Sequence, residues 1–274
     1  MYPKWQIVFF SLAINGIESV AEEKGYHVLI YLTHESFTRE EAILKDFQSG
    51  RVDGILMSLT AETARYGHIT RLSENNIAPV VFFDRVCDQI DTAKIVTDDF
   101  ESSYRATRHL ISCGCNQMAL LSISTHLSIS NQRYAGYKKA LEDADITCNP
   151  INHLFSGNNQ AADIALLRKI LSAQNRPDGI LASVEKLATD VYMVCKELQL
   201  RIPDQVRIVG FSNLSAASIL NPSLTTVTQP AFDIGKTAAS ILFRALEKKH
   251  FRIENSCTIL PSELIIRGST VAGN

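Results

Sequence analysis

Hydrophobic positions alternate between two spacings along nearly the whole chain. Eight stretches repeat their apolar residues at helical spacing, and short apolar runs lie between them. The helical stretches cover about 12–24, 38–49, 62–75, 99–112, 131–144, 160–173, 185–199 and 231–249. The apolar runs are Val28–Leu32, Gly54–Met57, Val80–Phe83, Ile95–Thr97, Met118–Ser122, Gly179–Ala182 and Val206–Gly210. The pattern therefore predicts strands and helices in turn.

The composition of the apolar runs indicates how the strands pair. Strands this rich in aliphatic residues suit parallel sheets that helices cover on both faces. The sequence thus predicts an α/β fold with doubly wound parallel sheets. Residues at the element ends agree, because Gly25 and Gly114 follow helical stretches, where glycine commonly ends a helix. Asp98 and Ser130 precede two other helical stretches, where we expect them to be N-caps.

Length and composition narrow the class of protein. The 274 residues are enough for one large domain or two lobes. Hydrophobic residues make up 46% and charged residues 20%, which is typical of soluble globular proteins. A formal net charge of −2 creates no general attraction to nucleic acid or to anionic membranes. No apolar run approaches the roughly 20 residues of a membrane span, so we expect no membrane partner.

The chemistry-bearing motifs do not indicate an enzyme. The start of the chain lacks the features of a signal peptide, so we expect reduced cysteines and a cytoplasmic location. Cys113 and Cys115 with His109 could hold a metal, but a helix ending at Gly114 explains their spacing. Gly235-Lys-Thr237 lacks the earlier glycine of a phosphate-binding loop. We expect no catalytic residues, no metal and no cofactor.

Three motifs in the last third of the chain are the most specific signal. They are Ile208-Val-Gly-Phe-Ser-Asn213, Asn221-Pro-Ser-Leu-Thr-Thr-Val-Thr-Gln-Pro230 and Glu263-Leu-Ile-Ile-Arg-Gly-Ser-Thr270. In this order and spacing they resemble the LacI/GalR family of transcriptional regulators, and in particular its effector-binding domain. Further segments that match the family are Phe9–Glu18, Arg51–Leu56, Pro79–Arg85, Ser130–Gly136 and Pro177–Leu181.

The resemblance implies a fold and a function. The fold would be two flavodoxin-like lobes of the periplasmic-binding-protein type, joined by three crossovers around a ligand cleft. By analogy the first lobe takes 1–116 and 231–254, and the second takes 117–230 and 255–274. Such a domain would bind a small polar effector, sugar-like or nucleoside-like, and would form a homodimer. The alternative with the same fold is the solute-binding protein of a sugar transporter, which an export signal would distinguish.

Two parts of the family pattern are missing from this sequence. The N-terminal helix-turn-helix is absent, so DNA contact is expected only through a domain outside this chain. The family also has a strand before Phe9, and its place in such a sheet is central, where an unpaired position leaves backbone groups unsatisfied. Either Ile7–Phe10 forms a shortened strand or the chain is truncated, and we favour truncation. A headless dimerising partner is a third possibility.

Arg133 is the first candidate for contact with a ligand. In open α/β sheets, ligands bind at the carboxyl ends of strands, where loops lead into helices. With Ser130 as N-cap, Arg133 would lie in a first helical turn, where the helix dipole disfavours a cation. A guanidinium group grips hydroxyls or a carboxylate well, and the matching arginine of the family binds effector. The alternative is a surface arginine paired with an acid.

The other candidates also fall near strand ends, and each has a structural alternative. Ser212 and Asn213 follow one strand, where many relatives have an aspartate first, so Ser212 puts a standard sugar contact in doubt; turn formation is the alternative. Glu185 starts a helix and could instead cap it. Phe9 and Phe10 match an aromatic pair that stacks on ligands in relatives, or they are core.

Three further residues complete the set of candidates. Asp84 and Glu101 lie near the ends of two more strands, and Glu101 matches a position that touches effector in some relatives. Gln229 begins one of the crossovers, where a role in the hinge or in the cleft is expected.

Overall fold

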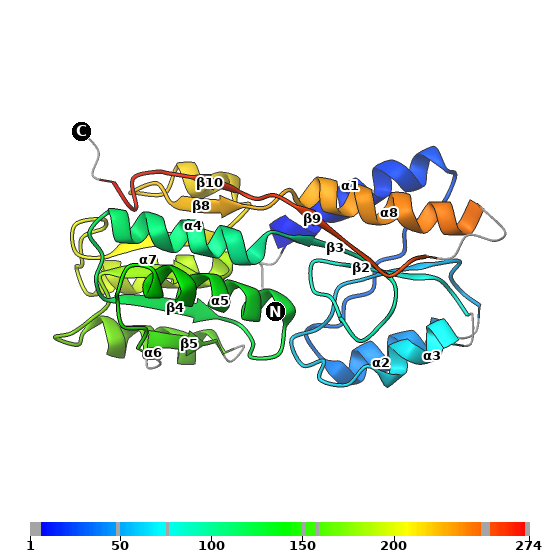
Figure 1. The fold of residues 1–274 in the computed structure, drawn as a ribbon, viewed down its shortest axis with the longest axis horizontal. Helices are drawn as coiled ribbons and strands as arrows, with labels where there is room; N and C mark the ends of the chain where they lie inside the picture. Colours follow the sequence, from blue (N-terminus) through cyan, green and yellow to red (C-terminus); the bar gives the residue numbers. More distant parts are fainter. Residues whose placement is uncertain are drawn as a thin grey trace.

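The computed structural model describes residues 7–47, 50–74, 77–149, 152–156, 159–247 and 253–271. These residues form two α/β lobes, one at each end of the long axis (Figure 1). One sheet has four strands in the order β1-β2-β3-β9, and the other has six in the order β10-β8-β7-β6-β4-β5. The predicted α/β class with parallel-sheet lobes is confirmed.

The four strands of the first lobe are all parallel. They are β1 (Ile55–Met57), β2 (Val80–Phe83), β3 (Ala93–Thr97) and β9 (Ser256–Leu260). Two helices cover one face, namely α1 (Ile7–Glu23) and α8 (Ala231–Glu247), and their apolar residues share a core with β2 and β3. The opposite face packs on α2 (Phe37–Phe47) and α3 (Gly67–Glu74).

The second lobe has a larger sheet, in which only β10 runs antiparallel to its neighbour. The strands are β4 (Met118–Ser122), β5 (His153–Phe155), β6 (Gly179–Ala182), β7 (Arg207–Phe211), β8 (Thr225–Thr228) and β10 (Glu263–Ile265). One face packs on α4 (Asp99–Ser112) and α5 (Ser128–Glu142), and the other on α6 (Gln160–Leu171) and α7 (Glu185–Glu197). No described helix is long and apolar enough to cross a membrane.

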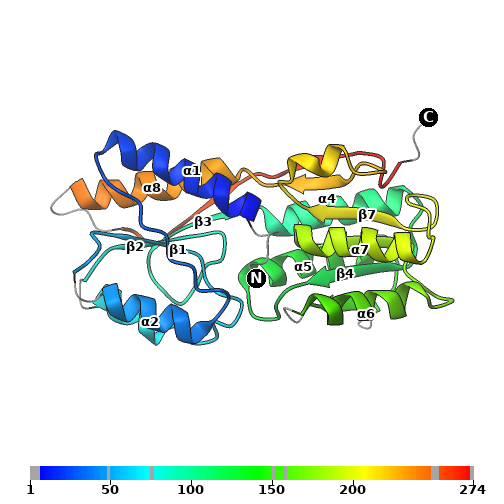
Figure 2. The ribbon, with the colours of Figure 1, turned by 180° about the vertical axis from the view of Figure 1, so that it is seen from behind.

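The chain passes between the lobes after β3, after β8 and after β9, and hydrogen bonds tie these three crossovers together. Gln229 Nε2 donates to Thr97 Oγ1 at 3.1 Å, and the backbone N–H of Ser262 donates to the Asp98 carboxylate at 2.7 Å. Asp98 is the N-cap residue of α4 as expected, but its side chain makes no capping hydrogen bond, because its carboxylate accepts from a neighbouring crossover instead. The three segments run side by side between the lobes (Figures 1 and 2).

Two elements lie in the other lobe from the one expected. Helix α4 falls before the expected boundary at 116, yet it packs on α5 and on the second sheet, because Ala106 and Leu110 share a core with β4 and β7. Strand β9 falls after the expected boundary at 254, yet it pairs with β3 in the first sheet. Packing partners distant in sequence decide both placements.

The expected strand at Val28–Leu32 is wrong, although six other expected strands are present to within about two residues. This segment connects α1 to α2 without pairing to any described strand, and four of its large apolar side chains are exposed. A shortened strand at Ile7–Phe10 is also wrong, since these residues form the start of α1. The apolar runs identified four strands fewer than the structure contains, because they missed β5, β8, β9 and β10.

Candidate ligand site between the lobes

The carboxyl ends of β2, β6 and β7 meet at a small cleft between the lobes, with a volume of about 60 Å³. Eight of the nine candidate residues line it: Phe9, Phe10, Asp84, Arg133, Glu185, Ser212, Asn213 and Gln229. The ninth, Glu101, is exposed on α4 and does not line the cleft. The fold thus gathers residues from six separate parts of the chain, and their contact with a ligand stays a prediction.

Arg133 lines this cleft and is buried, with 2% of its side chain exposed. Its Nε donates to Asp99 Oδ1 at 2.7 Å, and its Nη1 donates to the carbonyl oxygen of Ser183. The guanidinium carbon lies 3.9 Å from the centre of the Phe211 ring. The alternative interpretation of Arg133, a surface arginine paired with an acid, is wrong about the surface position, although a pairing with an acid is present. Helix α5 begins at Ser128, so Arg133 lies in its second turn and Ser130 is not the N-cap.

The pairing between Arg133 and Asp99 leaves one strong donor unused. Burial raises the pKa of Asp99, and the Arg133 charge opposes that rise. Arg133 Nη2 is buried and makes no hydrogen bond within the described residues, although it lies 2.7 Å from Asp99 Oδ1. A buried guanidinium donor without a well-aligned acceptor is costly. It is therefore available to an oxygen atom that enters the cleft.

Asp84 supplies a carboxyl group from the first lobe, directly after β2. Its backbone is left-handed, with φ of 61°, a conformation that a non-glycine residue adopts only when its surroundings hold it there. Burial raises the Asp84 pKa to about 6, while the charges of Arg85 and Arg133 partly oppose that rise. Near neutral pH this group can therefore change its charge in response to what occupies the cleft.

The candidates after β7 already bond to one another. Ser212 Oγ donates to Glu185 Oε2 at 2.8 Å and accepts from the backbone of Leu214 at 3.0 Å. Asn213 Nδ2 donates to the carbonyl oxygen of Gln229 at 2.6 Å. The turn chemistry considered for these residues is therefore present at Ser212, whereas the Asn213 side chain bonds to Gln229, 16 positions later. Burial raises the Glu185 pKa, against the bond from Ser212, and Glu185 does not cap α7 with its side chain.

Phe9 and Phe10 reach the cleft from the start of α1. Their ring centroids are 5.3 Å apart with planes at 88°, and the Phe10 ring lies 6.3 Å from that of Phe83. Both rings are half-buried, so they serve the core of the first lobe as well as the cleft wall. The two interpretations of this aromatic pair are thus compatible.

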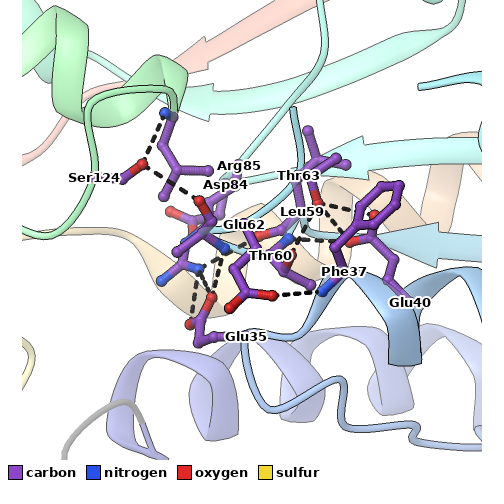
Figure 3. Close-up of polar contacts among 12 residues, drawn as sticks. Glu35, Phe37, Glu40, Leu59, Thr60, Glu62, Thr63, Asp84, Arg85 and Ser124 are labelled. Carbon is purple, nitrogen blue, oxygen red and sulfur yellow. Dashed lines mark hydrogen bonds and ion pairs between the residues drawn. The ribbon is translucent and has the colours of Figure 1, made fainter. Parts of the chain in front are cut away.

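A network of carboxylates holds the loop after β1 and fixes Arg85 beside Asp84 (Figure 3). Arg85 Nη1 donates to Glu35 Oε2 at 2.8 Å, and the same carboxylate accepts from the backbone of Ala61 at 2.7 Å. Glu40 accepts from the backbone of Thr60 at 3.1 Å. On the second lobe, Ser124 Oγ lies 3.5 Å from the carbonyl oxygen of Ala61 (Figure 3).

Several residues of the site were not found from the sequence. Asp99, which pairs with Arg133, is the first residue of α4. Five further residues that line the cleft were not among the candidates from the sequence: Arg85, Ile129, Ser183, Val184 and Phe211. The adjacency of Arg85 to Asp84 was a visible signal. Nothing local indicated the partner of Arg85, because Glu35 lies 50 positions earlier in the chain.

Within the described residues, no group of three or more His, Cys, Asp and Glu side chains could hold a metal ion. Cys113 Sγ lies 3.8 Å from His109 Nε2, and the chain turns at Gly114 with φ of 90°, after the end of α4. The spacing of these residues follows from the end of the helix.

Comparisons with known proteins place this geometry in a family. A family model described as a periplasmic binding protein-like domain matches residues 107–270. The repressor PurR of Vibrio vulnificus is 30% identical over 246 residues, covering 88% of this chain and 72% of that protein. The chain belongs to the LacI/GalR family of transcriptional regulators.

Other LacI/GalR relatives align over nearly the whole chain. The ribose operon repressor of Halalkalibacterium halodurans is 28% identical over 268 residues, covering 97% of this chain and 76% of that protein. A crystal structure of a putative ribose operon repressor from Burkholderia thailandensis has a TM-score of 0.82 at 26% identity and covers 94% of both chains. Both lobes therefore belong to the effector-binding domain of this family.

Proposed function

We propose that this chain is the effector-sensing domain of a LacI/GalR regulator. It binds a small polar metabolite, sugar-like or nucleoside-like, between its lobes. Binding then controls how a DNA-binding head, joined at the amino end of a homodimer, engages its operator. Two matched relatives are named as repressors, one of them of a ribose operon, which supports a regulator over the solute-binding protein of a transporter. We further propose that the domain binds its ligand without transforming it.

The arrangement of Arg133 is the observation that carries the proposal. Its guanidinium is buried, stacks on Phe211 and keeps Nη2 without a hydrogen bond in the described residues. Taking a charged pair out of water costs several kcal/mol, which makes the pair with Asp99 a poor device for stability alone. A ligand hydroxyl or carbonyl oxygen would satisfy Nη2, and a second hydroxyl would meet the carboxyl group of Asp84 across the cleft.

The small volume of the cleft indicates how a ligand enters. At about 60 Å³ it can hold a few water molecules, whereas sites for small organic ligands typically span about 300–1,000 Å³. The lobes must therefore separate about the crossovers, where Gln229 bonds to Thr97 and Asp98 accepts from Ser262. A ligand that prefers one lobe spacing shifts the population towards it. A coupling of about 1–3 kcal/mol to DNA binding is typical of such transitions.

Calorimetry of the 274-residue chain against a panel of pentoses, hexoses, purine bases and nucleosides tests the proposal. Arg133→Lys keeps the charge opposite Asp99 but removes the planar fork, so the affinity for any ligand found should fall at least about 100-fold. Arg168→Lys is the matched control, because Arg168 pairs with Glu197 on the surface of the second lobe. An affinity that Arg133→Lys leaves unchanged would exclude the assigned site. Binding by no member of the panel would exclude the ligand class.

A further inference from the structure

Four charged side chains line the interlobe cleft, two from each lobe. Asp84 and Arg85 belong to the first lobe, and Arg133 and Glu185 belong to the second. None of the two acids lies within hydrogen-bond distance of either guanidinium group, since the closest approach among these four is 3.9 Å, between Asp84 and Arg85. The way in which each charge is balanced therefore decides what charge a ligand should carry.

Each guanidinium group already has a carboxylate partner outside the cleft lining. Arg85 Nη1 donates to the two carboxylate oxygens of Glu35 at 2.9 and 2.8 Å (Figure 3). Arg133 Nε donates to Asp99 Oδ1 at 2.7 Å. Neither Glu35 nor Asp99 lines the cleft. The two positive charges are thus balanced before any ligand enters.

Asp84, the acid of the first lobe, has no such partner. Its carboxylate accepts no hydrogen bond within the described residues, and Arg85 Nε lies 3.9 Å from its Oδ2, beyond hydrogen-bond distance. The side chain is nevertheless 8% exposed, so water reaches little of it. A buried carboxylate without a donor is costly. Asp84 therefore needs a donor that the cleft itself does not supply.

Glu185, the acid of the second lobe, bonds only to neutral groups. Its Oε2 accepts from Ser212 Oγ at 2.8 Å, and no cation of the described residues pairs with it. Lys186 is its neighbour in the chain, but the Lys186 ammonium group lies 2.6 Å from the Asp163 carboxylate. The charge of Glu185 is therefore left without a positive partner in the described part of the chain.

The cleft and its supporting pairs carry an excess of negative charge. Four carboxylates surround two guanidinium groups, which leaves two negative charges when all are ionised, and the unpaired acids are Asp84 and Glu185. These acids come from opposite lobes, so closing the empty cleft brings like charges together, which is unfavourable. A positive group between them would replace the repulsion by attraction and stabilise the closed arrangement.

Other features of the cleft indicate that the positive group belongs to a hydroxylated organic molecule. Within the described residues no group of three or more acidic, histidine or cysteine side chains could hold a metal ion. Phe9 and Phe10 form part of the lining, and aromatic faces attract organic cations. Arg133 Nη2 and Ser183 Oγ are buried without hydrogen-bond partners in the described residues, so the ligand also needs acceptor oxygens.

We propose that the effector is a hydroxylated amine of the sugar or nucleoside type, whose ammonium group binds Asp84 of the first lobe and Glu185 of the second. Its hydroxyl oxygens accept from Arg133 Nη2 and Ser183 Oγ. The inference rests on the proposed function, because it assigns the ligand class of the same cleft. A neutral hydroxyl could bond to either acid but would leave the excess charge in place, and an anionic group would increase it.

Calorimetry of the 274-residue chain at about pH 7 tests the charge of the ligand with two matched series. The sugar series is 6-amino-6-deoxy-D-glucose, D-glucose and D-glucuronate. The nucleoside series is 5′-amino-5′-deoxyadenosine, adenosine and adenosine 5′-carboxylate. Within each series only the charge at one carbon changes. In at least one series the amine should bind at least about ten-fold more tightly than the neutral compound, and the carboxylate should bind most weakly.

Three variants show whether the preference for the amine arises in the cleft. Asp84→Asn and Glu185→Gln each remove one charge with little change of shape. Either substitution should lower the ratio of amine affinity to neutral-compound affinity at least about five-fold. Glu197→Gln is the matched control, because Glu197 pairs with Arg168 on the surface of the second lobe, and it should keep the ratio of the wild type. Circular dichroism checks that all three variants fold.

The possible failures are distinguishable. If the neutral compound bound as tightly as the amine, or the carboxylate more tightly than both, the inference would be overturned while effector sensing by the cleft would stand. A preference for the amine that persists in Asp84→Asn and in Glu185→Gln would also overturn it, because the ammonium group would then bind elsewhere. Binding by no compound of either series would exclude the inference together with the ligand class of the proposed function.

Discussion

The two lobes share an α/β arrangement, but the backbone groups of their sheets are hydrogen-bonded to different extents. In the second lobe β4, β6, β7 and β8 each have a neighbour on both edges, whereas β1 of the first lobe has one described neighbour and faces a groove on the other side. The helices cover both sheets in the same way. The difference shows that covering the faces of a sheet with apolar side chains does not satisfy its edges, because peptide groups need partners in the plane of the sheet.

The largest effect should come from truncating an apolar side chain in the fully paired sheet. Leu120→Ala removes a side chain that is 0% exposed in β4 and should lower the free energy of unfolding by about 2–5 kcal/mol. Leu29→Ala in the unpaired segment should change it by less than about 0.5 kcal/mol, because Leu29 is mostly exposed. Urea denaturation followed by circular dichroism measures both. If the two substitutions lowered the free energy of unfolding equally, Leu29 would be packed and the lobes would not differ as described.

The lobes also differ in how they hold an acid in the cleft, which predicts a dependence on pH. The Asp84 pKa is raised to about 6, so the native state binds more protons than the unfolded chain between about pH 4 and 6. Stability contributed by this group is present at low pH and is lost as pH rises through about 6. Asp84→Asn should therefore raise the free energy of unfolding by about 3 kcal/mol at pH 7.5, with no gain below about pH 4.

Urea titrations of both proteins at pH 7.5 and pH 4 measure this difference, and asparagine tolerates the left-handed backbone at position 84. Glu185→Gln is the comparison from the second lobe. Burial raises the pKa of Glu185, while the hydrogen bond from Ser212 opposes the rise. Glu185→Gln should therefore also raise the free energy of unfolding at pH 7.5, but by less than Asp84→Asn does. A gain for Asp84→Asn that does not change with pH would show that the carboxyl charge is not its cause.

In both lobes a glycine lets two helices pack closely, and replacing it should lower the free energy of unfolding by a similar, intermediate amount. Gly235 lets α8 approach α1, and Gly136 lets α5 approach α4; an added Cβ would lie 1.9 Å from Ala13 O and 2.1 Å from Phe100 O, respectively. Alanine at either position should cost about 1–3 kcal/mol through overpacking. Thermal unfolding of the two variants would sharpen the comparison. A much smaller cost for Gly235→Ala would mean that the open edge loosens the whole first lobe.

The smallest expected effect concerns a helix end in the second lobe. The Asn159 side chain accepts hydrogen bonds from the backbone of Ala161 and Ala162 at the start of α6. Asn159→Ala should cost about 1 kcal/mol, and Asn159→Ser should restore most of it, because serine also caps helices well. Equal melting temperatures for the wild type and Asn159→Ala would contradict the cap.

Much of the fold could be predicted from local patterns, and the errors have a common cause. Apolar runs identified β2 and β4 because buried parallel strands are apolar on both faces. The same criterion failed at Val28–Leu32, since a strand also needs a neighbour to pair with. Asp98 had the residue type of an N-cap, yet its carboxylate bonds to Ser262, 164 positions away. Local propensity does not report partners of that kind.

The sequence by itself determined the α/β class, the family and most of the residues that line the cleft, because each depends on residue types at short spacings. The three-dimensional structure decided the rest. It buried Arg133 against Asp99, moved α4 and β9 to the lobes where their partners lie, and left a groove beside β1. These features depend on which distant segments meet, and hydrogen bonds and packing across the fold settle that only when the chain is assembled.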